Sequence, residues 1–253
     1  MPEISQNLWQ NLPCKSQNLG QNPQNLARNS QRENFARELQ NLNQILYPKL
    51  AVFDFDSTLM DGETIDELAK AFGVSEKVAQ ITHLAMEGKL DFYESLKKRV
   101  ALLRGMSEKS AREVCHNLPL MEGAREIVEA LKSKGYKVVC FSGGFSLATA
   151  HFREILRLDA DFSNILHCKN GVLSGEVGGA MMFSNSKGVM LRTLQRLLNV
   201  ASRDTIAIGD GANDVAMFEF AEKKVAFCAK DALKKAANII ISRKDLREIV
   251  KYI

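Results

Sequence analysis

The sequence has no apolar run long enough to cross a membrane and no dense block of lysine and arginine. Its longest apolar runs fall well short of the roughly 18 residues that a membrane-spanning helix needs. The N-terminus lacks the basic-then-apolar pattern of a signal peptide, and the formal net charge is only +4. These absences argue against a membrane or nucleic-acid partner and favour a cytoplasmic protein.

Cysteines are few, scattered and without CxxC spacing. The chain of 253 residues has five, at Cys14, Cys115, Cys140, Cys168 and Cys228. An odd number without metal-ligand spacing is typical of reduced thiols in a cytoplasmic protein. Cys140 and Cys228 lie in apolar runs, so we expect both to be small core residues.

Residues 1–48 differ in composition from the rest of the chain, because they are rich in Asn and Gln. The tripeptide Gln-Asn-Leu recurs at 6–8, 10–12, 17–19, 24–26 and 40–42. Three repeats start seven residues apart, but Pro13, Gly20 and Pro23 interrupt any heptad. The composition predicts a disordered, low-complexity tail, and leaves open a helix over 31–46 and a role in assembly.

From Lys49 onward, short apolar segments alternate with helical patterns. We predict strands over residues 49–56, 136–144, 204–209, 224–229 and 238–242, and a hairpin over 165–177 that turns on Asn170-Gly171. We predict helices over residues 63–73, 91–103, 126–135, 187–198 and 245–253, with Met190, Leu194 and Leu197 on the apolar face of the fourth. Apolar strands that alternate with helices indicate an α/β fold with a parallel sheet covered on both faces. Residues 62–128 have helical patterns alone, which predicts a helical subdomain inserted between the first two strands.

Three predicted strands end in polar clusters: Asp54 with Asp56, Ser142-Gly143-Gly144, and residues 210–214. Ligands bind beyond the carboxyl ends of strands in such sheets, so adjacent strand ends would form one site. Four clustered aspartates need a cation, and oxygen-only ligands suit Mg²⁺. Lys187 and the glycine amides are candidate phosphate donors. One aspartate can attack phosphorus and become an aspartyl phosphate, while the other transfers protons.

The same segments resemble a known group of phosphatases. "DFDST" resembles the DxDx[TV] motif of the haloacid dehalogenase (HAD) superfamily, and "SGG", Lys187 and "GDGAND" resemble its later motifs in order. The words "DFDSTLMDGETID", "ESLKKRVALL", "FSGGF", "GDGANDVAMF", "KVAFCAK" and "DLREIVKYI" are similar to those of its phosphoserine phosphatase family. The resemblance covers residues from about 49 to 253. It implies a Rossmann-like parallel sheet core (49–61 and 129–253) with an inserted helical cap (62–128).

The resemblance implies Mg²⁺-dependent hydrolysis of O-phospho-L-serine through an aspartyl phosphate, the last step of serine biosynthesis. In this reading Asp54 is the nucleophile and a Mg²⁺ ligand, and Asp56 is the proton donor whose backbone carbonyl reaches the metal. Asp210 is the third ligand, and Asp214 orients that group of ligands or Lys187. The oligomeric state, a monomer or a homodimer, stays open.

The resemblance also implies the residues that bind the substrate. Ser142, Gly143 and Lys187 would hold the phosphate, with Asn213 beside it. Glu63 and Arg99 of the cap would bind the ammonium and carboxylate groups, since a guanidinium suits a carboxylate bidentately. Apolar Phe92 and Met86 would cover the site and exclude water.

Each of these residues also has an ordinary structural interpretation. The DFD sequence could be a solvated turn, Lys187 a surface lysine, Glu63 a partner of the helix dipole and Asn213 a helix N-cap. Three other functions compete with the leading one: hydrolysis of another phosphate ester, phosphoryl transfer to another small alcohol, and a non-catalytic binding role. Glu63 with Arg99 favours an amino-acid substrate over a sugar phosphate, and every catalytic position is occupied.

Overall fold

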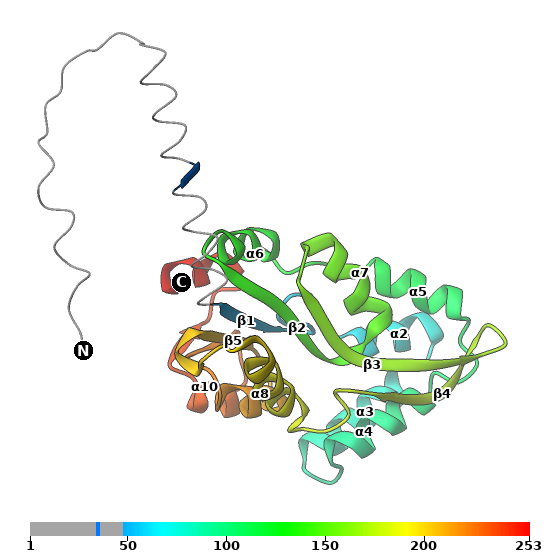
Figure 1. Ribbon diagram of the computed structural model, residues 1–253. Helices are drawn as coiled ribbons and strands as arrows, with labels where there is room; N and C mark the ends of the chain where they lie inside the picture. Colours follow the sequence, from blue (N-terminus) through cyan, green and yellow to red (C-terminus); the bar gives the residue numbers. More distant parts are fainter. Residues whose placement is uncertain (1–33, 36–47) are drawn as a thin grey trace, which may run out of the picture. The chain divides into compact units, whose positions relative to one another are not determined.

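The computed structural model describes residues 34–35 and 48–253 (Figure 1). The predictions for the N-terminal tail therefore fall almost wholly outside the described residues. In the described part, no helix combines the length and apolar character needed to span a bilayer.

One seven-stranded sheet organises residues 48–253, in the order β4-β3-β2-β1-β5-β6-β7. Its strands are β1 (Lys49–Asp54), β2 (Tyr136–Phe145), β3 (Ala160–Lys169), β4 (Val172–Gly179), β5 (Thr205–Gly209), β6 (Lys223–Phe227) and β7 (Ile239–Ile241). All neighbours pair in parallel except β3 and β4, which form the predicted hairpin. Asn170 and Gly171 at its turn both have positive φ, as a two-residue hairpin turn requires. The α/β prediction is confirmed, with β4 as an antiparallel edge.

Side chains of the central strand β1 alternate between two apolar layers. Ala51 and Phe53 pack in one core cluster, which also holds Ile127 of α6. Leu50 and Val52 pack in a second cluster, together with Leu191 of α8. In Figure 1, α6 and α7 cover one face of the sheet while α8 and α10 cover the other. Burial on both faces explains why β1 is apolar at every position from Leu50 to Phe53.

Helices fill the connections between the strands. They are α2 (Thr64–Phe72), α3 (Ser75–Met86), α4 (Phe92–Ala101), α5 (Glu108–His116), α6 (Ala124–Ser133), α7 (Ser146–Leu156), α8 (Ser186–Leu198), α9 (Val215–Phe218) and α10 (Asp231–Ala236), with short 3₁₀ segments η1 (Ser202–Asp204), η2 (Ala212–Asp214) and η3 (Leu246–Tyr252). Helices α2 to α6 all lie between β1 and β2 in the chain. The limits of the inserted subdomain stay a prediction; α6 crosses its predicted end at residue 128 and packs on β2.

Two local predictions differ from the structure, at Leu197 of α8 and at Cys228. On α8, Met190 and Leu194 are half-buried and pack on the second core cluster as predicted, but Leu197 is 75% exposed. The fully buried row is Lys187, Leu191 and Gln195, because the helix turns Lys187 toward the acids. The predicted C-terminal helix is present and is of the 3₁₀ type, as η3. Cys228 is exposed rather than a core residue, because β6 ends one residue earlier and Cys228 begins the following loop.

Candidate active site

The register of the sheet places the three polar strand ends side by side. Asp54 pairs with Phe141 of β2, so Ser142 lies one step beyond it. Phe53 pairs with Ile208 of β5, so Asp210 lies just past the same edge. The pairing of β2 with β3 shifts between Phe141 and Phe145, which frees the Ser142-Gly-Gly segment from a regular ladder.

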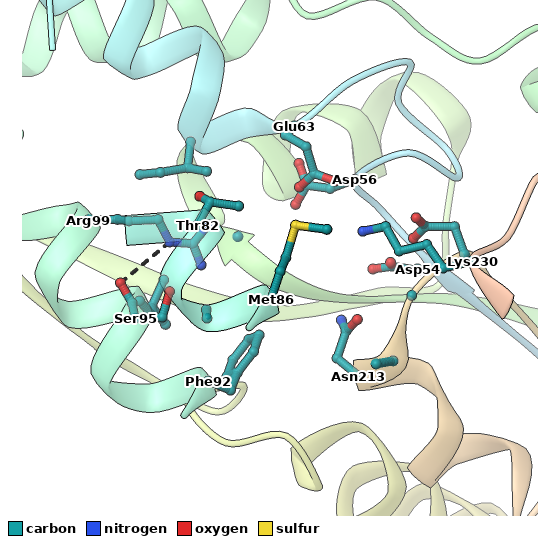
Figure 2. A pocket seen from close by; sticks show the side chains of 18 of the residues that line it. Asp54, Asp56, Glu63, Thr82, Met86, Phe92, Ser95, Arg99, Asn213 and Lys230 are labelled. Carbon is teal, nitrogen blue, oxygen red and sulfur yellow. Dashed lines mark hydrogen bonds between the residues drawn. The ribbon is translucent and has the colours of Figure 1, made fainter. Parts of the chain in front are cut away.

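A cavity of about 470 Å³ opens above these strand ends. One side of it is lined by residues at the strand ends and in the loops that follow, including Asp54, Asp56, Asp210 and Asn213. Residues of α3 and α4 line the other side (Figure 2). The predicted residues Glu63, Met86, Phe92, Arg99 and Gly143 all line this cavity. The structure therefore brings the two predicted groups, from the core and from the helical insertion, around one space.

Lys187 sits at the base of the cluster and is 3% exposed, which excludes the surface-lysine alternative. Its Nζ lies 2.5 Å from Asp54 Oδ1 and 2.5 Å from Asp214 Oδ1. The second oxygen of Asp214 accepts the backbone amides of Asp210 and Gly211, each at 3.0 Å. Both oxygens of Asp214 are thus already bonded, so this residue orients Lys187 and the loop after β5.

The acids at this site carry more negative charge than Lys187 neutralises. Burial, followed by the charge of Asp214, raises the pKa of Asp54. Burial and Asp214 also raise the pKa of Asp210 to about 6. Carboxylate oxygens of Asp54, Asp210 and Asp214 lie within 4.8 Å of one another. Since Asp214 is engaged, Asp54 and Asp210 are the carboxylates that best fit a hard divalent cation.

Asp56 is held in a different direction from Asp54, although one residue separates them. Its Oδ1 accepts the backbone amide of Thr64 at 2.7 Å and the Thr64 hydroxyl at 2.5 Å, at the start of α2. Its Oδ2 accepts the hydroxyl of Ser142 at 3.3 Å. Burial raises the pKa of Asp56, against these hydrogen bonds. The second aspartate thus has a defined orientation and an increased tendency to hold a proton.

Two glycines keep space for these side chains. A Cβ on Gly144 would lie 2.7 Å from Asp56 Oδ2, and one on Gly143 would lie 2.9 Å from Cζ of Phe92. Both distances are too short for real contacts, so neither position tolerates a side chain without displacing a neighbour. The close fit of Phe92 over Gly143 brings α4 directly onto the segment predicted to hold phosphate.

Glu63 and Arg99 present opposite charges to the cavity. Glu63 precedes α2, but its carboxylate accepts the Ser57 hydroxyl at 3.1 Å and does not cap the helix. Burial, then the charges of Asp56 and Asp210, raises its pKa to about 7. Arg99 is half-buried and donates from Nε to the Ser95 carbonyl at 3.4 Å. Burial lowers the pKa of Arg99, while Glu63 and Asp66 raise it.

Thr64 and Lys230 are among the residues at the site that were not predicted from the sequence. Thr64 fixes Asp56, and Lys230 lines the cavity beside Asp210. Both lie inside the segments "DFDSTLMDGETID" and "KVAFCAK", which carry the resemblance. That position in a matched word was the available signal, since a threonine in a first helical turn and a lysine after a strand are otherwise common.

Comparisons with known proteins agree with this geometry. The family model of haloacid dehalogenase-like hydrolases matches residues 48–222. A phosphoserine phosphatase of Wolinella succinogenes is 65% identical over 205 residues, which make up 81% of this chain and 100% of that protein.

Two solved structures show the same fold. One is described as a phospho-aspartyl intermediate analogue of phosphoserine phosphatase; it is 47% identical with a TM-score of 0.78, over 82% of this chain and 99% of that one. The other, a substrate-bound phosphoserine phosphatase complex, is 47% identical with a TM-score of 0.78, over 81% and 98% of the two chains. The chain is therefore a phosphatase that belongs to the phosphoserine phosphatases, within the haloacid dehalogenase-like hydrolases.

Proposed function

We propose that the chain hydrolyses O-phospho-L-serine to L-serine and phosphate, with Mg²⁺ as cofactor and an aspartyl phosphate on Asp54 as intermediate. The observation that carries this proposal is that one cavity is lined by two differently oriented aspartates and by Glu63 and Arg99, while the buried Lys187 pairs with one of the aspartates, Asp54. The relatives that are phosphoserine phosphatases support the same substrate.

The site fits a magnesium ion by its donors. The carboxylates of Asp54 and Asp210 and the backbone carbonyl of Asp56 would hold it. Burial, and then the charge of Asp214, raises the pKa of both carboxyl groups, and a cation would offset both effects. When bound, the ion neutralises this charge and polarises the phosphoryl group. Soft ligands are absent from the described part of the cavity wall apart from Met86, which favours Mg²⁺ over softer metals.

The two aspartates would divide the reaction between them. A carboxylate oxygen of Asp54 attacks phosphorus while the bond from phosphorus to the serine oxygen breaks. Asp56 gives its proton to that leaving oxygen, as its raised pKa allows. Asp56 then takes a proton from water, which attacks phosphorus and releases phosphate and free Asp54. Thr64 and Ser142 hold Asp56 in place through both steps.

Charges on the cap side would select the amino acid. The guanidinium of Arg99 would pair with the substrate carboxylate and Glu63 with its ammonium group. In Figure 2, Met86 lies between Arg99 and Asp54, with Phe92 below it. Both line the cavity, where they would exclude water from the phosphoryl group. We place this activity in the cytoplasm, as the step that releases L-serine in serine biosynthesis.

Phosphate release from a panel of esters tests the proposal. We expect turnover of O-phospho-L-serine well above that of sugar phosphates and p-nitrophenyl phosphate. EDTA should abolish turnover and excess Mg²⁺ should restore it, because Lys187 alone leaves the acids under-neutralised. Activity on the other esters alone would reject the substrate, and activity unchanged by EDTA would reject the metal. Transfer of the phosphoryl group to an added alcohol instead of water, with release of L-serine, would indicate a phosphotransferase.

Arg99→Ala tests the recognition of the carboxylate. We expect kcat/KM for phosphoserine to fall about 100-fold, because a charged hydrogen-bond partner is lost. For O-phosphoethanolamine, which keeps the ammonium and lacks the carboxylate, the change should stay within about threefold. The matched control is Lys98→Ala, an exposed neighbour on α4 outside the cavity. Equal losses on both substrates would show that Arg99 does not recognise the carboxylate.

A further inference from the structure

Lys230 lines the cavity directly, whereas Lys187 is buried against Asp54 and Asp214. Lys230 lies between β6 and α10 and is exposed. Its backbone amide donates to the carbonyl of Asp210 at 2.9 Å, which ties this loop to the end of β5. In Figure 2 its side chain extends toward the space next to Asp54 and Asp56. Lys187, by contrast, is buried and paired with two aspartates.

Lys230 has a free ammonium group within the part of the chain that the structure describes. Other lysines near the cluster form ion pairs, as Lys187 does with Asp54 and Lys244 does with Asp61. The ammonium group of Lys230 forms no such pair in residues 48–253. Its charge acts to lower the pKa of Asp210 and of Glu63 from a distance. A lysine without an ion-pair partner contributes no ion pair to the stability of the fold. The position of Lys230 at the rim of an acidic cavity is therefore better explained by ligand binding.

Two cations thus flank the acids from opposite sides. Arg99 comes from α4, and its charge acts on Glu63, Asp66 and Asp56. Lys230 comes from the core side, next to Asp210. The two lie at opposite ends of the cavity in Figure 2, with Met86 between them. A substrate with an anionic group at each end matches this spacing of charges.

We propose that Lys230 binds the phosphate end of the substrate and of the phosphate product, as a partner of Arg99 at the carboxylate end. This inference rests on the proposed function. Lys187 has two of its three N–H groups committed to Asp54 and Asp214, so it can offer the phosphate one donor at most. A phosphate monoester carries close to two negative charges and accepts several hydrogen bonds. Lys230 supplies the further donor and charge from the core side, where phosphorus must meet Asp54.

Inhibition by the two products separates the ends of the cavity. Inorganic phosphate reports the phosphate end and L-serine reports the cap end, each measured as a Ki with the full-length, Mg²⁺-loaded enzyme. For Lys230→Met we expect the Ki of phosphate to rise about tenfold, because one charged hydrogen bond is lost. The Ki of L-serine should stay within twofold of the wild-type value. Lys230→Arg should recover most of the phosphate affinity. Lys235→Met, an exposed lysine of α10 outside the cavity, is the matched control.

Each alternative result overturns the proposal. A higher Ki for L-serine with unchanged phosphate inhibition would assign Lys230 to the carboxylate end, and no change in either would remove it from binding. An equal rise in both, or a lower melting temperature, would indicate a structural role. Phosphate inhibition can be measured with any ester that the wild type hydrolyses, including p-nitrophenyl phosphate. Failure of the phosphoserine assignment is therefore visible separately, in the wild type's own substrate panel.

Discussion

Asp54→Asn is expected to lower kcat by about 10⁴-fold or more, the scale of loss when a covalent nucleophile is removed. Asparagine keeps the size of the side chain but cannot form the acyl phosphate. It also weakens the pair with Lys187 that lies at 2.5 Å. The measurement is steady-state turnover of phosphoserine at saturating Mg²⁺. Asp231→Asn, an exposed aspartate at the start of α10, is the matched control and should keep wild-type rates.

Loss of turnover alone would not separate a nucleophile from a metal ligand, so the intermediate itself has to be trapped. Wild-type enzyme quenched in acid during turnover of ³²P-labelled substrate should carry label that hydroxylamine removes, and Asp54→Asn should carry none. Asp56→Asn gives the contrast. With a good leaving group such as p-nitrophenol, phosphorylation of Asp54 needs no proton donor, whereas hydrolysis still needs a base. Label should therefore accumulate in Asp56→Asn, and label retained by Asp54→Asn would reject the nucleophile assignment.

The strand ends were predictable from the sequence because burial and topology leave little choice. A strand whose four residues before Asp54 are all apolar is expected to be central. A central parallel strand has neighbours whose carboxyl ends lie at the same edge of the sheet. The register of β1 with β2 and β5 then places Ser142 and Asp210 beside Asp54. The covering helix α2 was equally readable, since Gly73 ends it in the left-handed conformation that favours glycine.

Rotations of helices and contacts across long sequence separations were not predictable in the same way. The apolar pattern of α8 alone favours a face with Met190, Leu194 and Leu197, but the ion pairs of Lys187 rotate the buried row to include Lys187, Leu191 and Gln195. Thr64 and Lys230 meet Asp56 and Asp210 only because separate loops converge. No local periodicity encodes such convergence. The sequence therefore predicted the aspartates of the site but not Thr64 and Lys230, which contact them.

Lys187→Met is expected to destabilise the fold by about 3–5 kcal/mol, besides lowering turnover, because removing one partner of a buried ion pair leaves charge uncompensated. Methionine replaces most of the aliphatic stem, so the loss reports the ammonium group. Asp54 and Asp214 would then face each other while 3% and 0% exposed. Urea unfolding in EDTA, followed by circular dichroism, measures the effect on the metal-free protein. Lys251→Met, which breaks an exposed pair with Glu248, should cost no more than about 0.5 kcal/mol.

A second substitution shows whether charge or packing causes this loss. In Lys187→Met/Asp214→Asn the buried negative charge is reduced, while the asparagine oxygen can still accept the amides of Asp210 and Gly211. We expect the double variant to recover at least half of the lost stability but none of the lost turnover, because Lys187 is still absent from the phosphate. A double variant as unstable as Lys187→Met would show that packing of the stem dominates. Recovered turnover would mean that Lys187 serves only to neutralise Asp214, and Lys230 would then be left as the cation for the phosphate.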